Sequence, residues 1–382
     1  MNAPERLQSY ERLTAAEVRE FAVDVDRSAR FPTESIAALR REKLLGCLVP
    51  VEYGGLGMQL REIASLCEVL GASCASTGLI FAMHQIQIAC LARHALHNPY
   101  FQRVVRDIAE KQHLVASVTS EEGIGGAIHQ SSAALDLQAD HIVVEKRCPT
   151  TSYAAQADML LLTCRRADDR PAHDQVLIAL GPGTYELTQI QDWDTLGLRG
   201  TCSSGYLVSA RATREAVLDE PFAEILTHTM HPISHLLWCS VWIGIAQDAL
   251  RIAKSALVES KRGSQTIMRA DFRLSDALLE FSAMQNSVRH MLDDFSEIHS
   301  PRVSRAGQPN RTVALNNLKI QCSESVVNIV RAAMLIVGIR GYRNDSPYSL
   351  GRHLRDSMGA SLMVNNDRLS ANNAAILPIL TL

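Results

Sequence analysis

The sequence predicts an α+β protein in three parts: an N-terminal helical domain over residues 1–113, a middle β domain over 114–225 and a C-terminal helical bundle over 226–382. Three observations predict this order. Apolar residues recur at intervals of three and four in the first and last parts, whereas the middle part consists of short β-rich runs. A chain of 382 residues, 47% hydrophobic and 21% charged, is also long enough for two or three domains around one core.

The N-terminal domain shows helical spacing from Thr14 to about Ile108, as in Ile36-Ala37-x-Leu39. The only sharp break that we expect is the glycine-rich turn at 54–57, because three of its four residues are glycine. These patterns predict several helices with a turn between them.

The middle domain begins near Leu114, where runs of β-forming residues are separated by Gly, Pro and Asp. The runs cover residues 114–119, 142–144, 159–163 and 176–180. They predict a compact β-barrel or sandwich.

The helical period returns after Pro221 in long segments. They cover roughly 231–259, 269–298 and 312–338, with a connection rich in Gly, Pro and Arg near 300–309. Helices of this length in an up-and-down order predict a helical bundle.

Composition excludes several classes of function. The net charge is -3 with scattered Lys and Arg, so the chain has no electrostatic footprint for nucleic acid or an anionic membrane. The first residues do not resemble a signal peptide, and the longest apolar stretch, around 236–246, is too short to span a bilayer. Nine cysteines without Cys-x-x-Cys spacing indicate reduced thiols and no metal site. We therefore expect a cytoplasmic protein.

Three glycine-containing motifs follow one another along the chain. They are Val-Pro-Val-Glu-Tyr-Gly-Gly-Leu-Gly at 49–57, Thr-Leu-Gly-Leu-Arg-Gly-Thr at 195–201, and Gly-Ile-Arg-Gly-Tyr at 338–342, which Leu-Arg-Asp at 354–356 follows. In this order and spacing, over nearly the whole chain, they resemble the acyl-CoA dehydrogenase family. The resemblance implies a helical domain, a small β domain, a C-terminal four-helix bundle and FAD as cofactor.

The resemblance also implies where the flavin ring binds. The first contact is the loop at 119–126, where hydroxyls and close backbone approach would hold the ring through Thr119, Ser120 and Gly125. The second contact is the segment 148–153, where this chain has Cys-Pro-Thr-Thr-Ser-Tyr in place of the family's Trp-x-Thr. Thr150, Thr151 and Ser152 are therefore candidate hydrogen-bond donors to the flavin, and loss of the Trp implies a smaller or more polar wall beside the ring. An ordinary hairpin loop and a hydroxyl-capped turn are the alternatives.

Two other motifs have implied roles at interfaces. Arg340 and Gly341 match a turn that in the family lies against the FAD of a neighbouring subunit, which implies a homodimer or homotetramer. Arg199 is implied to position the domain interface rather than to catalyse.

The family's catalytic base is missing from both usual places. A dehydrogenase of this family removes the α-proton of an acyl thioester with a Glu, most often nine residues after the Arg of the Arg-Asp pair. Residues 361–368 contain no Glu, and neither does the other usual place, 231–238. The possible substitutes are His235, Asp367 and His84. Their alternatives are a polar core contact for His235, a solvated ion pair for Asp367 and core packing for His84.

Three functions remain open from the sequence. The first is an FAD-dependent oxidoreductase that acts on an acyl or aminoacyl thioester, bound to CoA or a carrier protein, with an electron-transfer flavoprotein as partner. The second is a flavin-dependent monooxygenase on the same fold, which needs a flavin reductase but no Glu. The third is a flavin-binding protein without catalysis.

Overall fold

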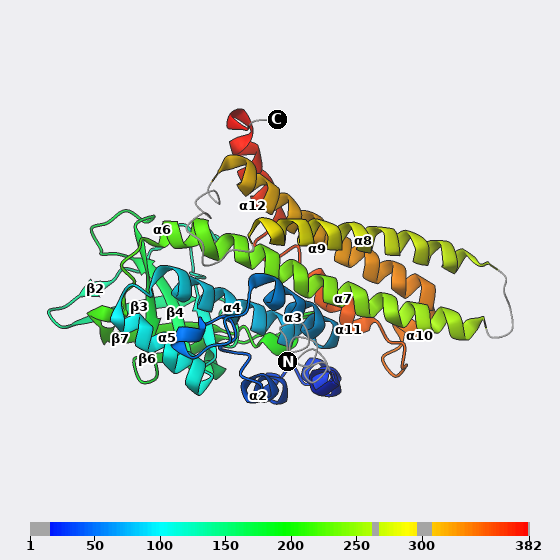
Figure 1. The fold of residues 1–382 in the computed structure, drawn as a ribbon, viewed down its shortest axis with the longest axis horizontal. Helices are drawn as coiled ribbons and strands as arrows, with labels where there is room; N and C mark the ends of the chain where they lie inside the picture. The colour runs from blue at the N-terminus through cyan, green and yellow to red at the C-terminus, as the bar shows by residue number, and fades with distance from the viewer. Residues whose placement is uncertain (1–15, 262–266, 296–307, 381–382) are drawn as a thin grey trace.

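The computed structural model describes residues 16–261, 267–295 and 308–380. Helices form its first and last parts, and the strands lie between residues 115 and 213 (Figure 1). The α+β class and the order of the three predicted parts are therefore confirmed. Residues 300–307 of the predicted Gly- and Pro-rich connection lie outside the described residues.

The N-terminal part is helical, as predicted. Its helices are a first one at 16–27, α2 (Thr33–Arg41), α3 (Leu60–Ser73), α4 (Ala75–His94) and α5 (Pro99–Lys111). The glycine turn at 54–57 has left-handed backbone at Gly54 and Gly57, with φ of 87° and 60°. It is not the only break, because extended backbone at Cys74 separates α3 from α4. Helix α4 is buried around nearly its whole circumference, so it forms the core between domains.

The middle part contains two separate sheets, so the closed barrel, one of the two predicted alternatives, is excluded. Strands β1 (Val115–Val118), β4 (Met159–Arg165) and β5 (Gln175–Leu180) form one sheet in the order β1-β4-β5. Strands β2 (Asp136–Leu137), β3 (His141–Cys148), β7 (Gly205–Thr213) and β6 (Tyr185–Gln191) form the other, in the order β2-β3-β7-β6. Strand β6 pairs with β7 alone, so it is an edge strand, and alternate residues along it are exposed to solvent. Its polar residues also explain why no apolar run revealed it.

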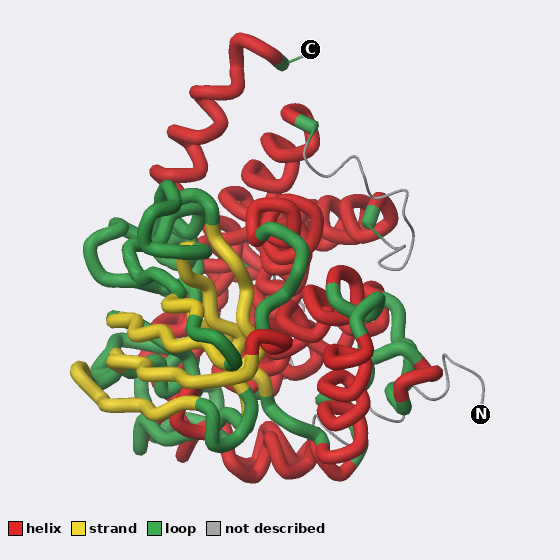
Figure 2. The backbone as a smooth tube through the Cα atoms, turned by 90° about the vertical axis from the view of Figure 1, so that its left-hand side faces the viewer, coloured by secondary structure: helices red, strands yellow, loops and turns green. Residues whose placement is uncertain are grey.

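The C-terminal part consists of long helices that lie side by side and extend away from the sheets (Figure 1). They are α7 (His231–Ser260), α8 (Arg269–Asp294) and α9 (Pro309–Val337), preceded by α6 (Phe222–Ile225) and a π-helical turn (Leu226–Met230). Shorter helices follow: α10 (Ile339–Tyr342), α11 (Gly351–Met358) and α12 (Asn366–Ile376). Helix α11 contacts α7 and α9, and the end of the chain projects from the body (Figure 2).

Three helical stretches are long and apolar enough to cross a membrane, by length and composition alone. They cover residues 75–94, 222–260 and 309–337. We expected from the run at 236–246 that no segment is long enough to span a bilayer. By length and mean hydropathy these three helices are long enough, because such helices tolerate interrupting polar residues. In this fold 94%, 78% and 44% of the most apolar part of each stretch is buried inside the protein.

The motif at 195–201 and the Arg-Asp pair dock onto each other. The backbone N–H of Leu198 donates to Asp356 Oδ1 over 2.7 Å, and Arg355 donates to the Leu196 carbonyl over 3.0 Å. Arg355 also binds both carboxylate oxygens of Asp26, at 2.8 and 2.5 Å. These contacts join the first helix, the β domain and α11. Burial raises the pKa of Asp356 to about 6.

The close approach at Gly197 gives a stability prediction. A Cβ atom there would overlap the Arg355 carbonyl and come within 2.7 Å of the Asp356 nitrogen, and both are backbone atoms that cannot move independently. Gly197→Ala should therefore lower the free energy of unfolding by about 1–3 kcal/mol, as overpacking does. Chemical denaturation measures the change. Gly181→Ala is the control, because a Cβ atom there meets nothing within 4 Å; equal effects of the two changes would contradict the proposed docking.

Candidate functional site

Two adjoining cavities lie where the β domain meets the helices. The outer cavity has a volume of about 420 Å³ and the inner cavity about 190 Å³. Both are lined by Met83 of α4 and by Thr150 and Ser152, which follow β3. Because these residues are shared, the cavities are two compartments of one site.

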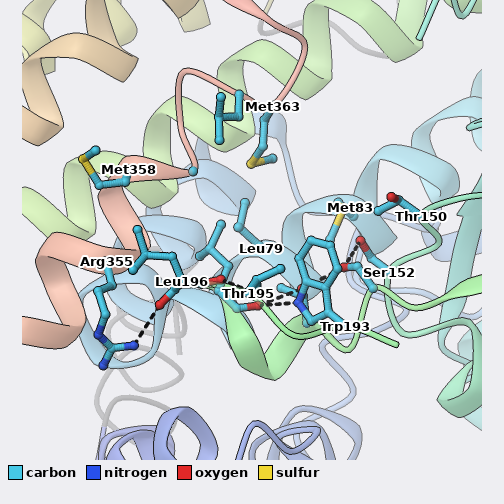
Figure 3. A pocket seen from close by; sticks show the side chains of 16 residues that line it. Leu79, Met83, Thr150, Ser152, Trp193, Thr195, Leu196, Arg355, Met358 and Met363 are labelled. Carbon is cyan, nitrogen blue, oxygen red and sulfur yellow. Dashed lines mark hydrogen bonds between the residues drawn. The ribbon is translucent and has the colours of Figure 1, made fainter. Parts of the chain in front are cut away.

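The outer cavity has apolar walls and a row of hydroxyls. Met358 and Met363 come from α11 and the segment after it, and Trp193 comes from the loop after β6 (Figure 3). The hydroxyls of Ser152, Ser203 and Thr201 are joined by hydrogen bonds of 2.8 Å each. This arrangement suits a flat ring system that is apolar on its faces and polar at an edge.

The inner cavity is formed by the π-helical turn and the first turns of α7. Leu226, Met230, His231, His235 and Trp238 line it from this side. A π-helical turn displaces side chains relative to an ordinary helix and is frequent at functional sites. Contacts from α4 fix this turn, since His94 Nε2 lies 2.6 Å from Thr229 Oγ1 and Arg93 donates to the His228 carbonyl over 3.2 Å.

Two histidines face each other in the inner cavity. The rings of His231 and His235 lie 4.3 Å apart, and His231 Nε2 is 3.1 Å from Asn316 Oδ1. His235 is fully buried, and its Nε2 has no hydrogen-bond partner. Burial lowers the pKa of both, and for His235 the neighbouring His231 and Lys319 lower it further. His235 is therefore a neutral imidazole that lines the inner cavity and whose Nε2 has no hydrogen-bond partner.

Val364 stands nine residues after Arg355, at the place where the resemblance leads one to look for the Glu. It lines the inner cavity. Its backbone is left-handed, with φ of 46°, which is costly for a β-branched residue, typically about 1–3 kcal/mol. Among the described residues, neither cavity is lined by a carboxylate.

The other two candidate bases lie elsewhere. His84 is buried between α4 and β1, where its Nε2 lies 2.7 Å from the Leu45 carbonyl and its Nδ1 accepts from the Val115 N–H over 3.0 Å. It lines neither cavity, so the structure places it as a core contact between domains. Asp367 is exposed in the first turn of α12 and also lines neither cavity. Of the three candidates, only His235 reaches the site.

The predicted flavin contacts converge on these cavities. Thr119, Ser120, Thr150 and Ser152 line the inner cavity, and Ser120 donates to the Thr150 carbonyl over 2.5 Å. This bond ties the two predicted segments together, although they are far apart in sequence. Thr151 is buried beside them, and its hydroxyl has no partner.

Gly125 lies in the exposed part of the loop rather than in a cavity wall. Its φ is 58°, and a Cβ atom would meet nothing within 4 Å. Arg368 of α12 donates to the carbonyls of Gly125 and Gly126. The glycines therefore provide left-handed backbone for a loop that Arg368 connects to α12.

Arg340 and Gly341 lie at the far end of the bundle from the sheets (Figure 1). Arg340 forms an ion pair with Glu259 over 2.7 Å and lies over the ring of Tyr348 at 4.4 Å. Gly341 is buried against Met334 and Val337. Neither residue contributes to the cavities of its own chain, and their role toward a neighbouring subunit stays a prediction.

Sequence reasoning missed several residues that line the site. Trp193 supplies an indole although the family's Trp is absent from 148–153, so the wall of the outer cavity is aromatic after all. His231 and Trp238 lie one turn from His235 on α7, and this helical spacing could have revealed them. No sequence signal leads to Trp193, because only the fold brings its loop there.

Family models match most of both helical parts. The model "Acyl-CoA dehydrogenase, N-terminal domain" matches residues 5–98, and "Acyl-CoA dehydrogenase, C-terminal domain" matches residues 232–363. The chain belongs to the acyl-CoA dehydrogenase family. This confirms the resemblance, and it makes the protein a flavin enzyme of the acyl-CoA dehydrogenase type.

Members of the acyl-CoA dehydrogenase family with different reactions match the chain. Cyclohex-1-ene-1-carbonyl-CoA dehydrogenase of Syntrophus aciditrophicus is 24% identical over 95% of this chain and 86% of its own. Dibenzothiophene monooxygenase of Rhodococcus qingshengii is 22% identical over 85% and 82%. The FMN-bound structure of TdsC from Paenibacillus sp. A11-2 superimposes with a TM-score of 0.85 at 18% identity, covering 98% of this chain and 97% of TdsC. The flavin is thus supported, whereas the reaction is not decided.

The placement of His84 predicts a pH dependence of stability. Burial lowers the pKa of His84 to about 4 from 6.5 in a free side chain. The unfolded chain therefore binds a proton between pH 6.5 and 4 that the folded protein does not, so the folded state loses stability as the pH falls through this window. At pH 5 this amounts to about 2 kcal/mol relative to pH 7.5.

We expect His84→Gln to reduce this pH dependence, because the amide can keep both hydrogen bonds without titrating. The free energy of unfolding, measured by denaturant titration at pH 5 and pH 7.5, checks it. The same pH dependence in wild type and variant would show that His84 is not held neutral.

Proposed function

We propose that this protein is a flavin-dependent monooxygenase rather than a thioester dehydrogenase. The observation that carries the proposal is the wall of the inner cavity, where Val364 occupies the place of the family's base. Removal of an α-proton needs a positioned base, and in the family that base is a carboxylate. No carboxylate of the described residues lines either cavity. Oxygenation on the same fold does not need a carboxylate at this place.

The size and polarity of the inner cavity support a compact, uncharged substrate. Its volume of about 190 Å³ is slightly larger than that of an apolar cavity of about 150 Å³ that holds benzene. A charged group would lose its hydration there without a counter-charge. The relatives named as dibenzothiophene monooxygenases are consistent with such a substrate.

The residues of the outer cavity fit a flavin ring. Its volume of about 420 Å³, its methionine and tryptophan walls and the hydroxyls of Ser152 and Ser203 match a flat ring with one polar edge. Thr119, Ser120 and Thr150 would hold the polar edge at the junction with the inner cavity. When bound and reduced, the flavin supplies the electrons that activate oxygen. A separate flavin reductase is the partner that this chemistry requires.

His235 is the residue that would handle a proton. Its Nε2 has no partner within the protein and can accept a hydrogen bond from a substrate in the inner cavity, and burial keeps the ring neutral and able to accept. A tilted contact with His231 and a stacked contact with Trp238 hold the ring of His235. Asp367 and His84 would have no direct part.

We also propose FMN rather than FAD as the bound form. Arg340, expected from the sequence to meet the diphosphate of FAD, has its charge balanced by Glu259 and its guanidinium engaged by the Ala256 carbonyl. The flavin released by heat from the purified protein should therefore run as FMN on a calibrated column, and Arg340→Ala should leave the flavin content unchanged. Release of FAD, with flavin loss in the Arg340 variant, would restore the prediction from sequence.

The reaction class is tested by anaerobic mixing of the oxidised flavoprotein with acyl thioesters of different chain length. We expect no bleaching of the visible flavin band. With a flavin reductase, NADH, oxygen and small aromatic or heterocyclic compounds, we expect an oxygenated product by mass spectrometry. Bleaching by a thioester alone would instead support the dehydrogenase, with an electron-transfer flavoprotein as partner. If neither reaction occurs, the remaining function is that of a flavin-binding protein without catalysis.

Variants within the same assay test the proton role. His235→Ala should lower product formation by roughly 10²–10⁴ with unchanged flavin content, because a positioned general base contributes about that factor. His235→Gln should be nearly as slow, because an amide cannot take up the proton. Asp367→Asn is the control and should be fully active. A slow Asp367 variant with active His235 variants would move the role to Asp367.

A further inference from the structure

Lys319 of α9 is a buried lysine close enough to His235 to affect its charge and hydrogen-bonded to the turn at Val364. It is fully buried, and no carboxylate of the described residues forms an ion pair with it. Its ammonium donates to the Val364 carbonyl over 3.0 Å and to Asn366 Oδ1 over 2.7 Å, and it lies 5.9 Å from the ring of Trp242. The lysine thus connects the bundle to the segment between α11 and α12.

This placement is unfavourable for a lysine considered alone. Burial of a cation costs free energy, and it lowers the pKa of Lys319 to about 8 although the charge of Glu324 opposes the shift. An apolar side chain of similar length would pack there without that cost. The cost of the buried charge is offset in part by the two hydrogen bonds that the ammonium donates, to the Val364 carbonyl and to Asn366 Oδ1.

Both acceptors belong to the turn that forms the wall of the inner cavity. Val364 has left-handed backbone, a conformation that a β-branched residue adopts only when its surroundings impose it. Lys319 holds the carbonyl of this same residue. Two positions later, Asn366 begins α12, and it also donates to Ser323 of α9 over 3.1 Å. The strained turn is thus fastened to α9, and Val364, which is 37% exposed, lines the inner cavity.

We propose that Lys319 is a positioning residue that holds the strained Val364 turn and so keeps this part of the inner cavity wall in place. Its charge has a second effect, because a cation close to His235 disfavours protonation of that ring. The inference goes beyond the reaction class: the cavity wall has to be held whether the protein oxygenates a compact substrate or oxidises a thioester.

The first test measures backbone amide hydrogen exchange in peptides that cover 361–370 of the full-length protein. Lys319→Met should raise exchange in this segment about tenfold or more, because it removes a charge-assisted hydrogen bond from a strained turn. Ser323→Ala is the matched control; it removes a bond to Asn366 but leaves the Val364 carbonyl bound, and should change exchange less than about threefold.

The second test asks whether the lysine acts through the turn. Val364→Gly removes the backbone strain, since glycine adopts positive φ freely. If Lys319 holds this turn in its strained conformation, Lys319→Met should raise exchange much less in the Val364→Gly background than in the parent. Equal, additive effects in both backgrounds would overturn the proposal and leave Lys319 a general contributor to folding.

The third test measures access to the cavity with acrylamide, a small neutral quencher of tryptophan fluorescence. Trp238 lines the inner cavity, and the difference between each protein and its Trp238→Phe counterpart isolates its signal. Lys319→Met should raise the quenching of Trp238 at least about twofold, and Lys319→Arg, which keeps the cation, should raise it less. Unchanged quenching in Lys319→Met would overturn the proposal.

If Lys319→Met does not fold, Asn366→Ala tests the same contact with the lysine in place. It should raise exchange at 361–370 by about threefold and leave the rest of α9 unchanged; no rise there would overturn the proposal. None of these measurements involves turnover. A failed oxygenation assay would therefore leave their outcome unaffected, and their failure would not bear on the reaction class.

Discussion

The docking of the loop at 195–201 onto Arg355 and Asp356 is the constraint on which the site depends. Gly197 lets two backbones touch, and the Leu198 N–H finds its acceptor in a buried carboxyl. Arg355 then reaches Asp26 of the first helix, so one short segment of α11 orients all three domains. The outer cavity is lined by this same junction, including Leu196, Gly197 and Leu198. Its shape is therefore set by a structural contact.

The electrostatics of the inner cavity follow from exclusion of water. Burial lowers the pKa of His231 and His235, and the neighbouring His231 and Lys319 lower that of His235 further. Without a carboxylate, such a cavity favours uncharged ligands and a neutral imidazole. A dehydrogenase of this family needs the opposite, an ionised carboxylate opposite the flavin. At the first of the two places where the family has its Glu, this chain has a valine on a strained turn.

The sequence predicted the elements well and the candidate bases less well. The helical segments at 231–259 and 269–298 correspond closely to α7 and α8, because apolar periodicity reports directly on a buried helix face. His84 and Asp367 were selected by their position along the chain. In the fold, His84 forms hydrogen bonds with two backbone groups, and Asp367 is exposed to solvent. Neither property can be read from the neighbouring residues in the sequence.

By itself, the sequence determined the family, the order of the domains and the absence of a Glu from both usual places, because glycine motifs and helical periodicity are local features. Only the tertiary structure decided that the strands form two open sheets, that Trp193 completes an aromatic wall and that Lys319 holds Val364. These depend on contacts between residues far apart in sequence. Position 364 illustrates the difference: counting from Arg355 leads to a valine, but only the fold places this residue in the wall of the inner cavity and its carbonyl on a buried lysine.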